Sequence, residues 1–461
     1  MKKDNINTLT TGSLARGFIS FLMPLLFGQL LQQLYNIADS LIIGNFADNA
    51  SFAAVSSCGN LCFLIVGFFM GLSNGAGVVI SRFYGANNEE GVSKAIQNTF
   101  FLGIITSIVV TVITTLLAPK IIIWMDTPIS VQPEAITYFR VYCMGISTII
   151  MYNLLIAIMR ALGDSMMPLI FLLISSVLNI VLDLFFVAVL HQGTFGAAFA
   201  TVIAQGVAAV LCYLRMQRKG GLFRINLKGS PFNGKILKQI ILQGLPSGIQ
   251  NSALSIGNVV IQTYINSFGE YAMSGQGAHI KIEGFVFIPI LSISMALSTM
   301  VSQNRGAGNY QRIRKGVKYS IISSVIIAQV IGAVIYIWAP QCISLFTKNP
   351  DSIAYGVTYA RTVTIFYFLL AFTHAASGIM LGMEKAMYSM VTFLSTWCIL
   401  RVAYTTIALN ISHTFVLLAL AYPITWASSS VIFLVTLLKQ MKKLPKGRDG
   451  EAGVVAAVAR R

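Results

Sequence analysis

The chain has 461 residues, of which 56% are hydrophobic and only 10% are charged, and its formal net charge is +17 at pH 7. Soluble proteins carry roughly 25% charged residues, so this composition excludes an ordinary soluble domain and indicates a polytopic membrane protein. The basic residues lie in short loops between apolar runs, so we expect no nucleic-acid partner.

Long apolar runs follow one another along the chain, and a membrane-spanning helix needs about 20 such residues. The first run is too long and too polar for a cleaved signal peptide, so we expect it to be retained. We therefore predict an all-α polytopic membrane protein with twelve transmembrane helices, at residues 17–43, 51–80, 95–118, 136–159, 167–190, 195–215, 239–267, 275–302, 317–339, 357–380, 388–409 and 414–438.

The first run carries polar residues at three- and four-residue intervals, which form one stripe on a helix. They are Gln29, Gln32, Gln33, Asn36 and Asp39. Pro24 precedes the stripe and favours a kink, because it removes a backbone donor. An acid inside an apolar span is costly and usually faces a cavity or a partner. Asp39 lies either in interfacial water at the helix end or, as we favour, in a solvent-accessible cavity as a functional carboxylate.

Lys and Arg set the orientation of a membrane protein. They gather at the N-terminus, in every second loop and at the start of the tail, whereas loops 44–50 and 191–194 contain none and loop 268–274 has only the acid Glu270. Because the number of spans is even, we predict a cell-membrane protein with both termini in the cytoplasm.

The two halves of the chain repeat at an offset of 221 or 222 residues. The matches include Met23-Pro24 with Leu245-Pro246, Ala118-Pro119 with Ala339-Pro340, and Thr137-Tyr138 with Thr358-Tyr359. Parallel repeats of this kind are related by an axis along the membrane normal, with the substrate path between the halves. We predict two pseudo-symmetric six-helix bundles. The predicted parts are a cytoplasmic N-terminus at 1–16, bundles at 17–215 and 239–438, a basic linker at 216–238 and a cytoplasmic tail at 439–461.

A second acid lies in the fifth span. Asn179 and Asp183 are four residues apart on one helix face, the sixth span adds Thr201, and the fourth adds Asn153. Two carboxylates with an amide and hydroxyls can bind a proton or a hard cation, which prefers oxygen ligands. Alternatively, Asp183 pairs with a lysine or caps a turn, although Lys and Arg occur in spans one to six only near their ends.

The second half of the chain lacks a counterpart of the acid in the first span. Asn36 corresponds to Asn258, but Asp39 corresponds to Ile261, so the acid belongs to the first half only. Glu283, in the eighth span, either contacts a cationic substrate, forms a second ion site or is held by Arg401. We assign substrate contact to Glu283 and to three cavity amides, Gln32, Gln250 and Asn258. His279 is expected to be a packed or lumen-facing residue rather than a metal ligand.

Together these features resemble the multidrug and toxic compound extrusion (MATE) family, and are most similar to its bacterial MepA-type branch. The resemblance covers about residues 10–440 and rests on MPLLFGQLLQQLYNIADSLIIG in the first span, RALGDSMMP after the fourth, LNIVLD in the fifth and GAAFAT in the sixth. It implies a V-shaped pair of six-helix bundles that exports amphipathic, often cationic, compounds in exchange for protons or sodium. It implies no cofactor beyond the coupling ion.

The resemblance also implies roles for single residues. Asp39, Asn179, Asp183 and Thr201 fall on family positions implicated in the cation site of the N-terminal bundle. Tyr35 and Asn153 fall on nearby positions, and we add Asn36 of the polar stripe. A sodium ion would be held by Asp39, Asn179 and Asp183.

The function that we expect is secondary active multidrug efflux by a monomer surrounded by lipid, with small drug molecules as substrates. No phosphate-binding loop, HExxH or serine-nucleophile motif occurs, so we expect no enzyme and an ion gradient as the energy source. The alternative is a lipid-linked oligosaccharide flippase of related architecture. Such flippases often carry basic residues in the cavity, whereas acids outnumber deep bases in the first half of this chain.

Overall fold

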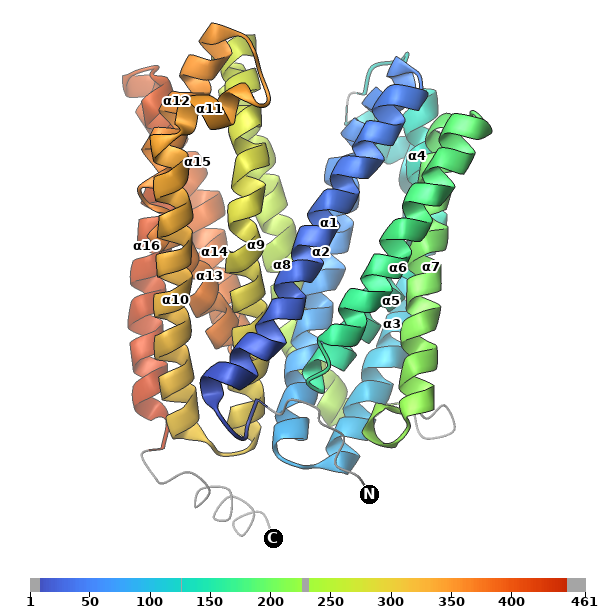
Figure 1. The fold of residues 1–461 in the computed structure, drawn as a ribbon, viewed down its shortest axis with the longest axis vertical. Coiled ribbons are helices and arrows are strands. Elements are labelled where there is room, and N and C mark those ends of the chain that lie inside the picture. The colour runs from blue at the N-terminus through green and yellow to red at the C-terminus, as the bar shows by residue number, and fades with distance from the viewer. Residues whose placement is uncertain (1–8, 126, 226–231, 446–461) are drawn as a thin grey trace. The chain divides into compact units, whose positions relative to one another are not determined.

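The computed structural model describes residues 9–125, 127–225 and 232–445, and every regular element in this part of the chain is a helix (Figure 1). Asp48, Asn88 and Asn349 each precede a helix and accept hydrogen bonds from its first amides, which the helix itself leaves without partners. The capped helices are α2 (Asn49–Gly85), α3 (Glu89–Trp124) and α12 (Pro350–Thr364). The hydrogen bonds from Ser51 also hold the pKa of the Asp48 carboxyl below its usual value.

Within the described ranges, nine continuous helical segments are long and apolar enough to cross a membrane, and two bent pairs raise the number to eleven. The nine are α1 (Leu14–Phe46), α2, α3, α6 (Met166–Asp183) with η1 (Leu184–Val189), α7 (Gly193–Lys219), α9 (Glu270–Gly306), α10 (Tyr310–Ile337), α14 (Ala386–Phe393) with η3 (Leu394–Leu400) and α15 (Arg401–Ile411), and α16 (Phe415–Lys443). The bent pairs are α4 (Gln132–Met144) with α5 (Ile146–Ala161), at 47°, and α12 with α13 (Tyr367–Gly382), at 56°.

The remaining long helix is α8 (Gly234–Asn266), which is not among the eleven and carries polar residues along its length, from Gln243 to Gln262. With it, the described chain contains twelve long helical segments in the order that the sequence predicts. Two short elements, η2 (Gly221–Phe223) and α11 (Ala339–Ser344), lie between them.

The chain divides into two compact units. Of the described residues, the first unit holds Met23–Gly248, and the second holds Leu9–Leu22 and the chain from Ile249 onward. Both divisions fall inside helices, next to Pro24 of α1 and close after Pro246 of α8. The domain boundaries predicted from the sequence remain a prediction.

Each unit, taken by itself, repeats one pattern of neighbours. In the first unit α2 packs against α3, α4 and α5, and α7 packs against α4, α5 and α6. In the second unit α9 packs against α10, α12 and α13, and α16 packs against α12, α13 and α15. The helices correspond one to one in chain order, so the repeat in the sequence is also a repeat in the structure.

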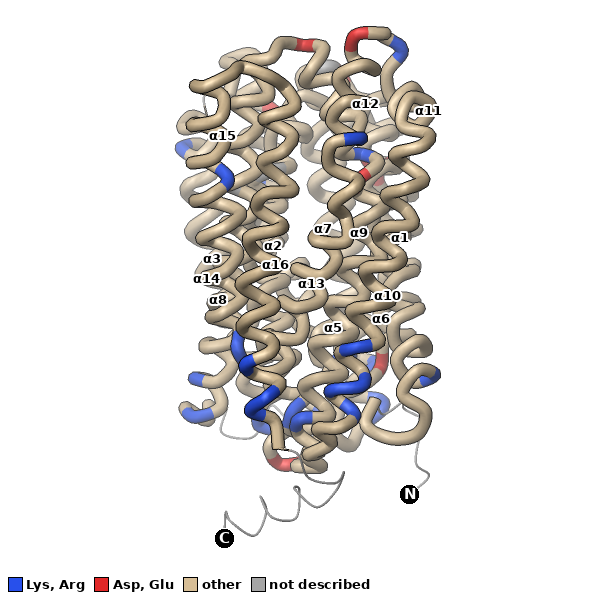
Figure 2. Tube along the Cα trace, turned by 90° about the vertical axis from the view of Figure 1, so that its left-hand side faces the viewer, with Lys and Arg blue, Asp and Glu red and all other residues tan. Residues whose placement is uncertain are grey.

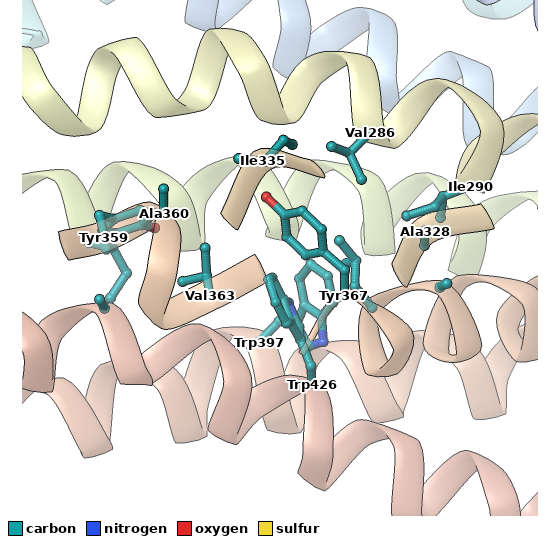
Figure 3. Close-up of a cluster of buried hydrophobic side chains, with 14 of the residues drawn as sticks. Val286, Ile290, Ala328, Ile335, Tyr359, Ala360, Val363, Tyr367, Trp397 and Trp426 are labelled. Atoms are coloured by element: carbon teal, nitrogen blue, oxygen red, sulfur yellow. The ribbon is translucent and has the colours of Figure 1, made fainter. Parts of the chain in front are cut away.

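The core of the second unit is rich in aromatic rings. Figure 3 shows Tyr367, Trp397 and Trp426 close together among aliphatic side chains, with Tyr359 farther away beside Ala360 on α12. Trp426 and Tyr367 are fully buried, with ring centroids 5.9 Å apart. Tyr367 shares a hydrogen bond with Glu283, and the Trp397 ring lies against the guanidinium of Arg401.

Lys and Arg gather mainly at one end of the helices in each unit (Figure 2). In the first unit this end includes Arg82 at the end of α2 and Lys219 at the end of α7. In the second unit it includes Arg305 at the end of α9 and Lys442 at the end of α16. Because basic residues are retained on the cytoplasmic side, this end is predicted to face the cytoplasm.

Two glycines of α2 allow a close helix crossing inside the first unit. A Cβ atom on Gly71 would lie 2.4 Å from the backbone of Ser247 on α8, and one on Gly75 would lie 2.3 Å from the backbone of Gly244. Small residues spaced by four let helix backbones approach in this way.

We expect Gly75→Ala to destabilise the purified protein by about 1–3 kcal/mol, because the new methyl group meets backbone rather than a movable side chain. Thermal unfolding in detergent measures the effect. Gly59→Ala on the same helix is the matched control, since a Cβ there has no neighbour within 4 Å. Equal losses in the two variants would contradict the close crossing.

Candidate functional site

Three helices of the first unit bring polar side chains to one place. Helix α1 supplies Tyr35 and Asp39, and α6 supplies Asn179 and Asp183. Each of these pairs is spaced by four residues, so both members lie on one helix face. Helix α7 adds Thr201.

The two carboxyl groups contact each other directly, through a side-chain hydrogen bond between Asp39 and Asp183. Asp183 is fully buried, at 0% exposure, and Asp39 is half-buried. The Oδ1 atom of each is buried without a hydrogen-bond partner in the described part of the chain. Two carboxylates in contact cannot both keep a bare charge away from water, so the arrangement suits a proton or a small cation.

The amide of Asn179 connects this pair to α7. In the orientation that satisfies both amide atoms, its Nδ2 donates to Asp183 Oδ2 at 2.7 Å and its Oδ1 accepts from the Thr201 amide at 3.3 Å. The Thr201 side chain in turn shares a hydrogen bond with Tyr35. The structure therefore brings together Tyr35, Asp39, Asn179, Asp183 and Thr201, all predicted from the sequence.

Two other predicted residues hydrogen-bond within their own helices instead. Asn36 is exposed and accepts from Gln32 Nε2 at 3.4 Å, and Asn153 donates to the Ile149 carbonyl at 2.9 Å. Among the residues described, no group of three or more His, Cys, Asp or Glu could hold a metal ion. Any cation at the pair would thus need neutral oxygen donors as well as the carboxylates, and Asn179 could offer its Oδ1 to it only in the other amide orientation, since here Nδ2 faces Asp183.

The residues assigned to substrate contact are divided between the units. Gln32 belongs to the first unit, whereas Gln250, Asn258 and Glu283 belong to the second. Gln250 and Glu283 are half-buried, and Asn258 is exposed and accepts from Arg401 Nη1 at 3.3 Å.

The sequence did not indicate that Glu283 lies among aromatic side chains. Glu283 shares a side-chain hydrogen bond with Tyr367, and the Tyr367 hydroxyl lies 3.3 Å from His279 Nε2. His279 is fully buried against Tyr359, at a ring distance of 5.0 Å. The one available signal was Trp397, which precedes Arg401 by four residues and so shares its helix face.

A repeat of helices long and apolar enough to cross a membrane, with polar groups inside each half, is typical of a membrane transporter. The MatE family model matches residues 24–185 and again residues 246–407, once in each half. The chain therefore belongs to the MatE family of transporters, and the family predicted from the sequence is confirmed.

Relatives and solved structures agree with this assignment. The chain is 28% identical to the "Probable multidrug resistance protein YpnP" of Bacillus subtilis, over 86% of this chain and 88% of the relative. It is 22% identical to the "Multidrug export protein MepA" of Staphylococcus haemolyticus, over 80% and 81%. A solved multidrug resistance MATE transporter in an outward-facing conformation superposes with a TM-score of 0.90 at 23% identity, over 97% of this chain and 100% of that chain. The predicted fold class is confirmed.

We expect Asn179→Leu to cost about 1–3 kcal/mol of stability, because it removes the donor from a buried carboxylate. Asn153→Leu is the control, since that amide bonds only to a carbonyl of its own helix. Thermal unfolding of the two purified variants compares them. If Asn153→Leu lost as much stability as Asn179→Leu, the hydrogen bond from Asn179 to Asp183 would add no more than a bond within one helix.

Proposed function

We propose that the protein is a secondary active multidrug efflux transporter that exports amphipathic, often cationic, compounds by antiport with protons or sodium ions. The observation that carries the proposal is the direct contact of Asp39 and Asp183 in the first unit. The names of the relatives support the drug substrates, since both are described as multidrug proteins. The protein is proposed to act as a monomer in the cell membrane, with both termini in the cytoplasm.

The coupling ion is proposed to bind at the carboxyl pair. A proton would be shared by the two acids, and sodium would use the same oxygens together with Asn179 and Thr201. Either ion removes the repulsion between the acids and so favours one arrangement of α1 on α6, with Pro24 as the bend in α1. Release on the inside restores the repulsion and resets the transporter.

The membrane potential adds to the driving force whenever more positive charge enters with the coupling ions than leaves with the substrate. One positive charge moving inward gains about 2.3 kcal/mol per 100 mV, which is nearly 50-fold in an equilibrium constant.

The residues proposed to contact the substrate remain Gln32, Gln250, Asn258 and Glu283. Amides and a single acid suit compounds that carry a positive charge and an apolar body.

The test is ethidium efflux from proteoliposomes, with proton and sodium gradients imposed separately. We expect one or both gradients to drive efflux, and Asp39→Asn and Asp183→Asn to abolish the driven component, because an amide cannot take up the ion in exchange. Asp351→Asn at the exposed start of α12 is the matched control and should transport normally. Undiminished ion-driven efflux in both site variants would reject the coupling role.

A further inference from the structure

The segment that leads into α1 is bound along its backbone by side chains of the second unit. We call residues 9–12 the N-terminal segment, and each of its four carbonyls accepts a hydrogen bond from α9, from α10 or from the turn between them. Arg312 supplies three of these bonds at 2.7–3.0 Å, to the carbonyls of Leu9, Thr11 and Gly12. Hydrogen bonds from a charged donor are stronger than neutral ones, and the planar guanidinium directs several of them at once.

Two asparagines complete this set, and we call Asn304, Asn309 and Arg312 the anchor residues. Asn304 Nδ2 donates to the Leu9 carbonyl and Asn309 Nδ2 donates to the Thr10 carbonyl, both at 3.2 Å. Asn304 is fully buried, and the Leu9 side chain is only 1% exposed. Because the anchor residues bind carbonyls that precede the first turn of α1, they fix the place where this helix begins.

The equivalent positions of the first unit carry different residues. Helices α2 and α9 end at equivalent residues, 221 apart. At this offset Asn304 corresponds to Phe83. Arg312 corresponds to Gly91, where a Cβ would lie 2.5 Å from the Phe83 ring. A ring therefore packs against a glycine in the first unit where the second unit places two anchor residues, so the anchor does not follow from the repeated fold alone.

The helix that begins at this anchor belongs partly to each unit. Residues 9–22 belong to the second unit, together with the anchor residues, whereas the chain from Met23 and hence Asp39 belongs to the first. Leu14, the first residue of α1, also contacts α10, because its Cδ1 lies 3.6 Å from the place of a Cβ on Gly316. Most other side chains of α1 are exposed or half-buried, so the attachment of its start depends mainly on these contacts.

We propose that Arg312 is a positioning residue for transport, whose hydrogen bonds keep the start of α1 attached to the second unit throughout the transport cycle. The coupling ion at Asp39 then moves only the later part of the helix. A helix that was free at its start would shift as a whole instead of bending at Pro24. The effect on transport rests on the proposed function, whereas the attachment itself does not.

Trypsin tests the attachment without a transport assay. Arg16 is exposed on the first turn of α1, and cleavage after it requires this turn to unwind. In purified protein, Arg312→Gln should speed this cleavage at least about 10-fold, because it removes three hydrogen bonds from a charged donor. Mass spectrometry measures the product. The matched control is Arg314→Gln, since Arg314 lies on the same helix but donates to the carbonyls of Leu444 and Pro445. Equal cleavage of Arg312→Gln and wild type overturns the inference.

A covalent link tests whether the N-terminal segment stays attached during transport. Thr10→Cys and Asn309→Cys replace two residues that are joined by a hydrogen bond of 3.2 Å, in a protein whose six native cysteines are changed to alanine. A mild oxidant forms the disulfide, and a short bis-maleimide replaces it if oxidation is incomplete. Ion-driven ethidium efflux from proteoliposomes should be undiminished by the link. Efflux that the link stops overturns the inference, because the segment then has to detach.

The same link distinguishes positioning from a general loss of stability. Arg312→Gln should lower ion-driven efflux about 2–30-fold, the range for mutations that alter coupling between sites, and the link between positions 10 and 309 should restore it. A defect that the link does not repair overturns the positioning role, and so does normal efflux in a rapidly cleaved Arg312→Gln protein. If Arg312→Gln does not fold, Arg312→Lys takes its place, because it keeps the charge but lacks the planar set of donors.

Failure of the antiport proposal would be recognised separately. If wild-type proteoliposomes showed no ion-driven efflux while Arg312→Gln was still cleaved faster after Arg16, the antiport proposal would fail and the attachment would stand.

Discussion

The contact between Asp39 and Asp183 is the constraint on which the first unit depends. Two unit charges about 4 Å apart repel by about 4 kcal/mol at an effective dielectric constant near 20. A hydrogen bond to a charged group, such as the one from Asn179, contributes about 1.5–3 kcal/mol. That bond alone does not offset the repulsion between two ionised carboxylates, so we propose that a proton or a cation accompanies the contact. In this proposal, binding of the cation and packing of α1 on α6 are linked.

Helix α1 belongs partly to each unit, so a change at the acid pair can be transmitted along it. Its start is fixed in the second unit, where Arg312 donates to the carbonyls of Leu9, Thr11 and Gly12 at 2.7–3.0 Å. Its later turns, with Asp39, belong to the first unit. Pro24 lies where the helix passes from one unit to the other and lacks a backbone donor. Pro24, which donates no backbone hydrogen bond, therefore lies between Asp39 and the anchored start of the helix.

The sequence revealed the parts of the site but not all of their contacts. Spacing by four put Asp183 beside Asn179 on one helix face, and the repeat predicted the pseudo-symmetric helical fold. Spacing could not show whether a polar side chain reaches across helices or turns back to its own backbone, and Asn153 turns back. The partners of Arg401 also lay beyond the sequence, because they come from three helical segments and meet only through tertiary packing.

The aromatic core of the second unit and the buried charge of Arg401 depend on each other. A buried guanidinium needs acceptors for its N–H groups and polarisable faces around it. Asn258 and Thr425 supply the acceptors, and Trp397 and Tyr422 supply the faces. The burial of this one cation therefore depends on side chains from three helical segments, η3, α8 and α16, rather than on a single partner.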